Sequence, residues 1–179
     1  MSPQSLEIGQ KAHLTKRFGA TEVAAFAALS EDFNPLHLDP AFAATTAFER
    51  PIVHGMLLAS LFSGLLGQQL PGKGSIYLGQ NLSFKLPVFV GDEVTAEVEV
   101  IALRDDKPIA TLATRIFTQG GALAVAGDAV VKLPCAPTAH GHNQPGPRRA
   151  DCLRHSLISP APFIPFFEAI EPWPFPCPA

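Results

Sequence analysis

Apolar and polar positions alternate in parts of residues 75–133, as they do in strands that bury one face. The pattern is clear in Thr95-Ala-Glu-Val-Glu-Val, where a polar residue occupies every second position. Stretches rich in Val, Ile, Thr and Phe predict four strands, at residues 75–86, 93–103, 108–119 and 122–133. A further strand is predicted at residues 11–18, and short turns separate the later strands, the clearest at Gly120-Gly121.

Two stretches carry helical patterns instead. Residues 20–30 predict a short helix with Thr21 as its cap. Residues 54–70 are apolar on nearly every side, which indicates a helix that is buried all round. Two prolines interrupt residues 32–40, so this segment is expected to be irregular.

One buried helix followed by a four-strand antiparallel meander favours an α+β fold in which the sheet wraps around the helix. The order of the elements alone leads to this hot-dog fold. No internal repeat is visible, and a chain of 179 residues has room for one domain with a sizeable core.

Composition changes abruptly after Pro134. All three cysteines and 10 of the 18 prolines lie beyond it. Proline removes backbone donors and resists both helix and sheet. Residues 1–134 are therefore predicted to be the folded domain, and residues 135–179 a mostly disordered, Pro-rich tail. The spacing of Cys and His in the tail fits no usual zinc pattern, so no metal site is predicted.

Charge and hydropathy limit the classes of binding partner that the sequence predicts. A net charge of −3 provides no basic surface for nucleic acid or an anionic membrane. Residues 1–11 lack the apolar core of a signal peptide. The longest apolar stretch, residues 56–66, is interrupted by Ser60, Ser63 and Gly64 and is too short to span a bilayer. We expect a cytoplasmic protein with no nucleic-acid or membrane partner.

Candidate chemistry gathers in the bend at residues 32–40. Asp32 and His37 lie five residues apart, and the apolar Phe33 and Leu36 between them predict that the loop faces the core. A carboxylate and an imidazole in a dry loop form a candidate acid–base pair. The structural alternative is that Asp32 caps backbone amides and His37 satisfies a carbonyl, and residue types alone leave both open.

His54-Gly55 opens the apolar helix. A glycine at a helix N-terminus exposes backbone N–H groups that the helix dipole supports, and such donors hold a developing oxyanion. Alternatively, Gly55 permits tight helix packing. Ser63 lies farther along this helix and either bonds back to a helix carbonyl or reaches a substrate.

These residues carry a resemblance to a known family. The segment Asp32-Phe-Asn-Pro-Leu-His37 is similar to the hydratase-2 motif of the MaoC-like hot-dog hydratases, and Ile52-Val-His-Gly-Met56 is similar to the second signature of that family. The match covers nearly all of residues 1–134 and resembles the short (R)-specific enoyl-CoA hydratases that feed polyhydroxyalkanoate synthesis. The chain departs from the family at two positions, where glycine and tyrosine are common: Glu31 and Phe26.

The resemblance implies roles for single residues. Asp32 would be the general base toward a water that attacks C3 of a trans-2-enoyl-CoA. His37 would polarise this water and deliver a proton to C2, so that syn addition gives an (R)-3-hydroxyacyl-CoA. The Gly55 N–H would stabilise the enolate-like charge. Supporting roles would fall to Asn34, Ser63 and His54. Hydration leaves the oxidation level unchanged, so no cofactor is expected.

The family also implies an apolar acyl pocket and a second copy of the chain. The candidate pocket walls are Leu57, Leu61, Leu65, Leu66 and Val131. Hot-dog domains of this size usually pair into homodimers with the sites near the interface. Basic residues would bind the CoA phosphates, and the sequence does not choose among Arg50, Lys73 and Lys85.

Two other functions stay open. A hot-dog thioesterase shares the fold and the substrate, but it would direct water at the thioester carbonyl. A non-catalytic acyl-CoA binding module would bind the same ligand without turnover. The placement of His37 and of His54-Gly55 favours hydration over hydrolysis.

Overall fold

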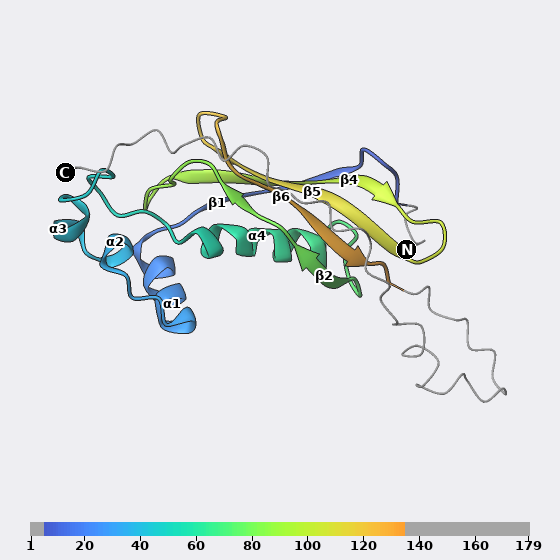
Figure 1. Ribbon diagram of the computed structural model, residues 1–179, viewed down its shortest axis with the longest axis horizontal. Helices are drawn as coiled ribbons and strands as arrows, with labels where there is room; N and C mark the ends of the chain where they lie inside the picture. The colour runs from blue at the N-terminus through green and yellow to red at the C-terminus, as the bar shows by residue number, and fades with distance from the viewer. Residues whose placement is uncertain (1–5, 135–179) are drawn as a thin grey trace. The chain divides into compact units, whose positions relative to one another are not determined.

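The structure, a computed structural model, describes residues 6–134, so the predicted tail at residues 135–179 lies outside the described residues. One antiparallel sheet of six strands dominates the described part of the chain (Figure 1). Its strands are β1 (Lys11–Arg17), β2 (Ile76–Gln80), β3 (Ser83–Phe84), β4 (Glu93–Leu103), β5 (Ile109–Thr118) and β6 (Leu123–Lys132). The strand order is β1-β4-β5-β6-β2, and β3 also pairs with β6.

The predicted four-strand meander is wrong in one respect. Strands β4, β5 and β6 follow one another as neighbours, but β2 and β3 pair with β6 rather than with β4. The predicted strand at residues 75–86 is therefore two strands at the far edge of the sheet. Asn81 separates them, because its N–H and Oδ1 bond to the carbonyl and N–H of Asp128. Its carbonyl approaches Gly127 so closely that a Cβ there would overlap it.

The described helices are α1 (Ala20–Ser30), α2 (Pro35–Leu38), α3 (Pro40–Ala43) and α4 (Gly55–Gln68). Helix α1 has the predicted bounds, but Thr21 is not its cap. The capping residue is Gly19, where the backbone is still extended, and its N–H donates to the Glu22 carboxylate at 3.0 Å. The bend expected to be irregular contains the short helices α2 and α3, each of which begins with a proline, a residue suited to the first helical position.

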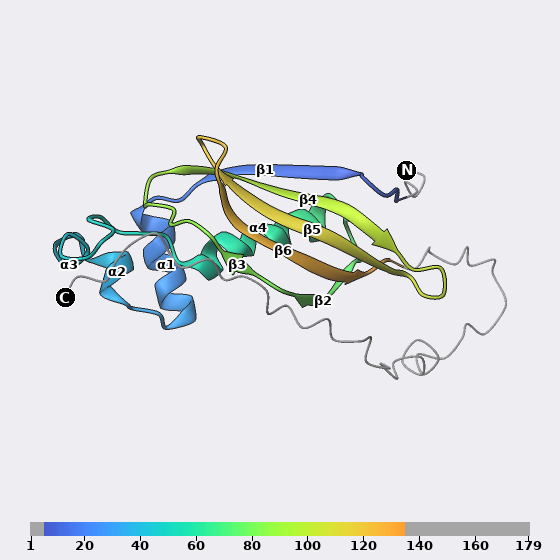
Figure 2. The same ribbon diagram turned by 45° about the horizontal axis from the view of Figure 1, so that its top comes forward.

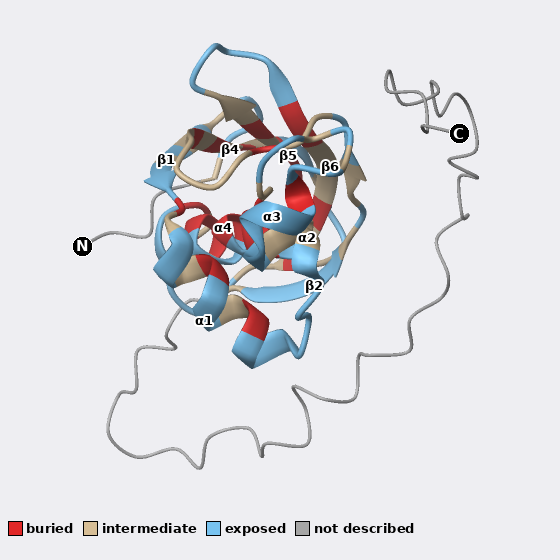
Figure 3. Cartoon of the chain, turned by 90° about the vertical axis from the view of Figure 1, so that its left-hand side faces the viewer, coloured by how far each residue is buried: buried red, intermediate tan, exposed pale blue. Residues whose placement is uncertain are grey.

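Helix α4 lies against one face of the sheet, and the strands curve around it (Figures 1 and 2). Phe62 and Leu65 of α4 are fully buried together with Leu112 and Ile116 of β5, and they belong to one hydrophobic core. Figure 3 shows the buried residues of α4 between the sheet and α1. None of the helices within residues 6–134 has the length and hydropathy to cross a membrane.

The prediction that this helix is buried all round is wrong for the described chain. Met56 is 59% exposed, and Ser60 and Ser63 are also exposed. The two serines and the neighbouring Gly64 are small or polar, so this stripe offers little apolar surface to bury. The open stripe of α4, defined by Met56, Ser60 and Ser63, is the feature that shapes the candidate site.

Candidate active site

The bend after α1 is held by side chains that act on its own backbone. Asp32 Oδ1 accepts the N–H of Asn34 at 3.3 Å, and Asn34 Oδ1 accepts the N–H of Leu36 at 3.1 Å. Asn34 thereby caps α2, which carries His37. Just before the bend, Glu31 has a left-handed backbone with φ 60°. Asp32 and His37 thus belong to one short hydrogen-bonded unit, which fixes their spacing.

The ring of His37 is oriented by the segment that leads into α4. Its Nδ1 lies 2.8 Å from the carbonyl oxygen of Ile52. A carbonyl only accepts hydrogen bonds, so Nδ1 carries a proton and Nε2 is the nitrogen left for a water or a substrate. The structural alternative named from the sequence therefore holds at Nδ1, which satisfies a carbonyl, while the catalytic role of His37 stays a prediction.

His54 touches both members of the pair. It is 2% exposed, and its Nε2–H donates to the backbone carbonyl of Asp32 at 3.1 Å. Its ring stacks on that of His37 with the centroids 3.8 Å apart, and the ring of Phe26 lies 5.1 Å away. Burial lowers the pKa of His54; the bond to the Asp32 carbonyl opposes this shift, and the neighbouring His37 adds to it. His54 is therefore neutral near pH 7.

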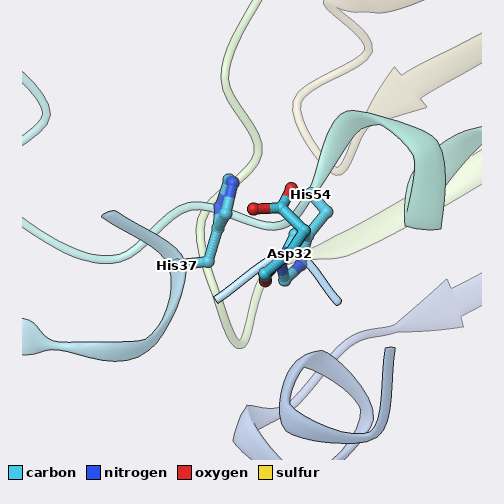
Figure 4. Close-up of side chains that lie close together, drawn as sticks. All are labelled: Asp32, His37 and His54. Carbon is cyan, nitrogen blue, oxygen red and sulfur yellow. The ribbon is translucent and has the colours of Figure 1, made fainter. Parts of the chain in front are cut away.

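Asp32, His37 and His54 converge (Figure 4), and one side-chain N or O atom of each lies within 4.8 Å of the others. The Asp32 carboxylate points toward the His37 ring. Hydrogen bonds to water are about 2.8 Å long, so this spacing suits one water between them. His54 uses Nε2 for the Asp32 carbonyl, and its Nδ1 is buried with no hydrogen-bond partner among the described residues.

Gly55 is the first residue of α4, so its N–H has no acceptor within the helix. Since it directly follows His54, this amide lies next to the converging side chains. A Cβ on Gly55 would lie 2.8 Å from a ring carbon of Phe84 in β3. Both reasons for a glycine named from the sequence therefore apply here: it begins the helix with an available donor, and it makes room for an aromatic ring.

The bend at residues 32–40 is more exposed to solvent than predicted. Phe33 is 62% exposed and Asp32 is exposed, whereas Leu36 is half-buried. The expectation that the loop faces the core is wrong for the described chain, because α1, α2 and α3 lie beyond the end of the sheet (Figures 1 and 2). Asp32 is therefore reached from solvent in the single chain.

A cavity of about 500 Å³ runs along the open stripe of α4. Strand β2 forms the opposite wall, and Phe26 lines the cavity where it also contacts His54. The cavity is therefore linked to the converging side chains through Phe26, although Asp32, His37 and His54 do not line it. The residues that line it are Phe26, Met56, Ala59, Ser60, Ser63, Tyr77, Leu78, Gly79, Gln80 and Leu82.

The five residues named from the sequence as acyl-pocket walls do not line this cavity, and their role stays a prediction. All are buried in the core: Leu57, Leu61, Leu65, Leu66 and Val131. A sequence pattern does not separate the face of α4 that packs on the sheet from the face that borders a cavity. Ser63 does line the cavity, and no hydrogen bond to a helix carbonyl engages its hydroxyl within residues 6–134.

The three basic residues considered for CoA phosphates occupy different places. The Arg50 guanidinium lies 3.9 Å from the ring centre of Phe89 and 3.8 Å from Asp92. Arg50 precedes the segment that orients His37, and Lys85 directly follows Phe84, so both lie toward the start of α4. Lys73 follows the opposite end of that helix.

Sequence reasoning missed several residues of the site, among them Phe84, Tyr77 and Gln80. Phe84 packs on Gly55, and Tyr77 and Gln80 line the cavity. One signal was available: the chain has 13 Phe and a single Tyr, so the lone phenol hydroxyl stood out in an otherwise apolar set of aromatic residues.

The family model described as MaoC like domain matches residues 4–119. The chain belongs to the MaoC-like domain family. This MaoC-like chain is 92% identical over 134 residues to the (R)-specific enoyl-CoA hydratase of Aeromonas caviae, a match that covers 75% of the chain and 100% of the relative.

Solved structures agree with this membership. The (R)-hydratase from A. caviae involved in PHA biosynthesis matches with a TM-score of 0.72 and 92% identity, over 73% of this chain and 99% of that one. The R-hydratase PhaJ1 from Pseudomonas aeruginosa, in its unliganded form, matches with a TM-score of 0.70 and 45% identity, over 73% of this chain and 84% of that one. The MaoC-like chain therefore has the predicted hot-dog fold.

Proposed function

We propose that this chain is an (R)-specific enoyl-CoA hydratase, which adds water in a syn sense to a trans-2-enoyl-CoA. The product is an (R)-3-hydroxyacyl-CoA, which links fatty-acid β-oxidation to polyhydroxyalkanoate synthesis. The observation that carries the proposal is the convergence of Asp32 and His37 on a water-sized space, next to the start of α4 at Gly55. The curated relative with this activity in its name is 92% identical across its whole length.

In the proposed reaction, one water is held between the Asp32 carboxylate and Nε2 of His37. As the water oxygen bonds to C3, Asp32 takes one of its protons and the π electrons move toward C2 and the thioester oxygen. The N–H at Nε2 of His37 gives its proton to C2 on the same face. The proton on Asp32 then passes to His37 through the next water, which restores the starting state. Acid–base help of this kind contributes about 10²–10⁴-fold in rate.

The Gly55 N–H is the proposed donor to the thioester oxygen as negative charge builds there. A donor of this type contributes about 10²–10³-fold, and the dipole of α4 acts in the same direction. Neutral His54 supports the pair without adding charge, because it holds the Asp32 carbonyl and stacks on His37. The acyl chain then runs away from the thioester into the cavity beside α4.

We also propose that the protein forms a homodimer through β2. Strands β1 and β2 are the two edges of the sheet within residues 6–134. Strand β1 carries Lys11, Lys16 and Arg17, whereas Ile76 and Leu78 of β2 are 54% and 52% exposed. Charged edges discourage pairing and apolar edges favour it. A second copy at β2 would also border the cavity. The cytoplasmic location and the independence from a cofactor stay predictions.

Turnover of crotonyl-CoA tests the proposed reaction. Hydration removes the absorbance of the enoyl group and leaves the thioester intact, so the expected result is loss of that band without free thiol. Release of thiol without any hydroxyacyl-CoA would identify a thioesterase. Binding of acyl-CoA without any turnover, unchanged by Asp32→Asn and His37→Gln, would identify a non-catalytic module. Chiral analysis of the product checks the (R) configuration.

A further inference from the structure

One polar network lies behind the β2 wall of the cavity. The side-chain amide of Gln80 donates from Nε2 to Thr114 Oγ1 at 2.9 Å and to the carbonyl of Asn81 at 2.6 Å. Its Oε1 accepts the hydroxyl of Tyr77. Both N–H groups and the carbonyl of this amide are therefore engaged, which holds the Gln80 side chain in one conformation.

The network is anchored in the core of the sheet. Thr114 of β5 is fully buried, between Leu112 and Ile116 on the face that packs toward α4. A buried hydroxyl without a partner is costly, so the Gln80–Thr114 bond resists breaking. Tyr77 and Gln80 line the cavity, whereas Thr114 does not. The network thus joins the cavity wall to the buried face of the sheet.

The rest of that wall pairs irregularly with its neighbour inside the chain. The register of β2 with β6 shifts between Tyr77 and Gly79, which leaves Leu78 outside the ladder. Across the cavity, the wall from α4 is fixed because the other side of this helix forms the core. The width of the cavity between Ser63 and Tyr77 therefore depends on the hydrogen bonds of Gln80.

We propose that the Tyr77–Gln80–Thr114 network determines which acyl-chain lengths the cavity accepts. This inference rests on the proposed function, since it assigns the cavity to the acyl chain. Along α4, Met56 and Ser63 are seven residues apart, which corresponds to roughly 10 Å of wall. With the network intact, the β2 wall stays close to Ser63 and limits the far end. When it loosens, the wall yields and longer chains fit.

The test compares Tyr77→Phe and Thr114→Val, which remove one hydroxyl each and keep nearly the same shape. The quantity measured is the ratio of kcat/KM for trans-2-octenoyl-CoA to that for crotonyl-CoA. Each buried methylene contributes about fourfold in affinity, so admitting even one more raises the ratio at least about fourfold. The double variant is expected to change the ratio little beyond either single variant, because the three side chains act as one unit.

Thr111→Val is the matched control. Thr111 lies on the same strand, at a position that alternates to the opposite face from Thr114, so the ratio should stay at the wild-type value. If Thr114→Val prevents folding, Tyr77→Phe carries the test, since the Tyr77 side chain is 39% exposed. A ratio within twofold of wild type in every folded network variant overturns the inference.

A second readout separates this inference from the proposed reaction. The dissociation constants of butyryl-CoA and octanoyl-CoA, measured by calorimetry, require no turnover. A relative gain for octanoyl-CoA in Tyr77→Phe supports the network as a length determinant even if crotonyl-CoA is not hydrated. Equal dissociation-constant ratios in wild type and both variants count against the network, whereas absent hydration with a shifted ratio counts only against the hydratase assignment.

Discussion

The imidazole ring of His54 stacks on that of His37, with 3.8 Å between the ring centroids. The same side chain donates from Nε2 to the backbone carbonyl of Asp32 at 3.1 Å. One buried histidine therefore touches both members of the proposed acid–base pair. The geometry of the pair depends on a residue whose role is to position it.

The neutral state of His54 predicts a dependence of stability on pH. Below about pH 6.5 the unfolded chain protonates this histidine, while in the folded chain burial resists protonation until a lower pH. The contribution to stability is therefore complete above about pH 6.5 and is lost as the pH falls below it, by at most about 1.4 kcal/mol per pH unit. Urea unfolding at a series of pH values should show a shallower slope for His54→Gln than for wild type. His13→Gln, a substitution at an exposed histidine, is the control and should keep the wild-type slope. Identical slopes in wild type and His54→Gln would contradict the prediction.

Removal of either acid–base side chain predicts a loss of turnover without a loss of fold. Asp32→Asn and His37→Gln should each lower kcat for crotonyl-CoA by about 10²–10⁴-fold, and the double variant should be little worse, because the two groups act as a unit. Asp39→Asn makes the same chemical change at the cap of α3, where asparagine also serves. Its kcat should match wild type. A similar loss in Asp39→Asn would mean that the bend, rather than the carboxylate, had been disturbed.

Many of the helices and strands could be predicted from the local pattern of apolar and polar residues. The bounds of α1 and β4 are those predicted, because each shows its own period over about ten residues. The position of β2 in the sheet could not be predicted from the local pattern, because it depends on contacts of Asn81 with Gly127 and Asp128 some 47 residues later. Pairings this distant in sequence leave no local signal.

The candidate site divides in the same way. Asp32, Asn34 and His37 were predictable because one short segment holds them, and the family motif names them. The cavity could not be predicted from the sequence, because Gln80 and Thr114 come into contact only after the sheet has formed. Leu65 and Ser63 have neighbouring positions on α4, yet one enters the core and the other borders the cavity.

The close contact between Gly55 and Phe84 predicts a compensating pair of substitutions. Gly55→Ala places a Cβ 2.8 Å from the Phe84 ring, so either the ring or the start of α4 must move. We expect a loss of about 1–3 kcal/mol in unfolding free energy and a lower kcat, because the donor at residue 55 is displaced. Adding Phe84→Leu should recover part of both losses. The four proteins form a double-mutant cycle, and strictly additive effects would argue against the contact as the cause.

The left-handed backbone of Glu31 predicts that glycine is tolerated there. Glu31 has φ 60°, a conformation that costs about 1–2 kcal/mol for residues with a Cβ and none for glycine. Glu31→Gly should therefore leave the unfolding free energy unchanged or raise it by up to about 1 kcal/mol. Ala28→Gly, at an exposed helical position of α1, should instead lower it by about 1 kcal/mol. Thermal unfolding of Glu31→Gly and Ala28→Gly distinguishes these outcomes. Equal destabilisation of both variants would contradict the prediction that glycine is tolerated at residue 31.

The apolar edge at β2 predicts the effect of a charge on assembly. Leu78→Lys should shift the protein from dimer toward monomer in light scattering, because a lysine on an edge strand opposes pairing. Thr15→Lys places the same charge on β1 at the opposite edge, and its mass should equal that of wild type. Monomeric wild-type protein at micromolar concentration would remove the basis of the prediction.

Asp32, His37, His54 and Gly55 all fall within one continuous stretch of the chain, before most of the sheet has begun. The groups that border the acyl cavity from β2 come later. Reactivity and selectivity thus depend on separate parts of the polypeptide, which meet where Phe26 borders the cavity and where Phe84 packs on Gly55. A graft of residues 26–63 onto the strands of a related hot-dog protein would carry the chemistry with it, while the recipient strands would decide which substrates enter.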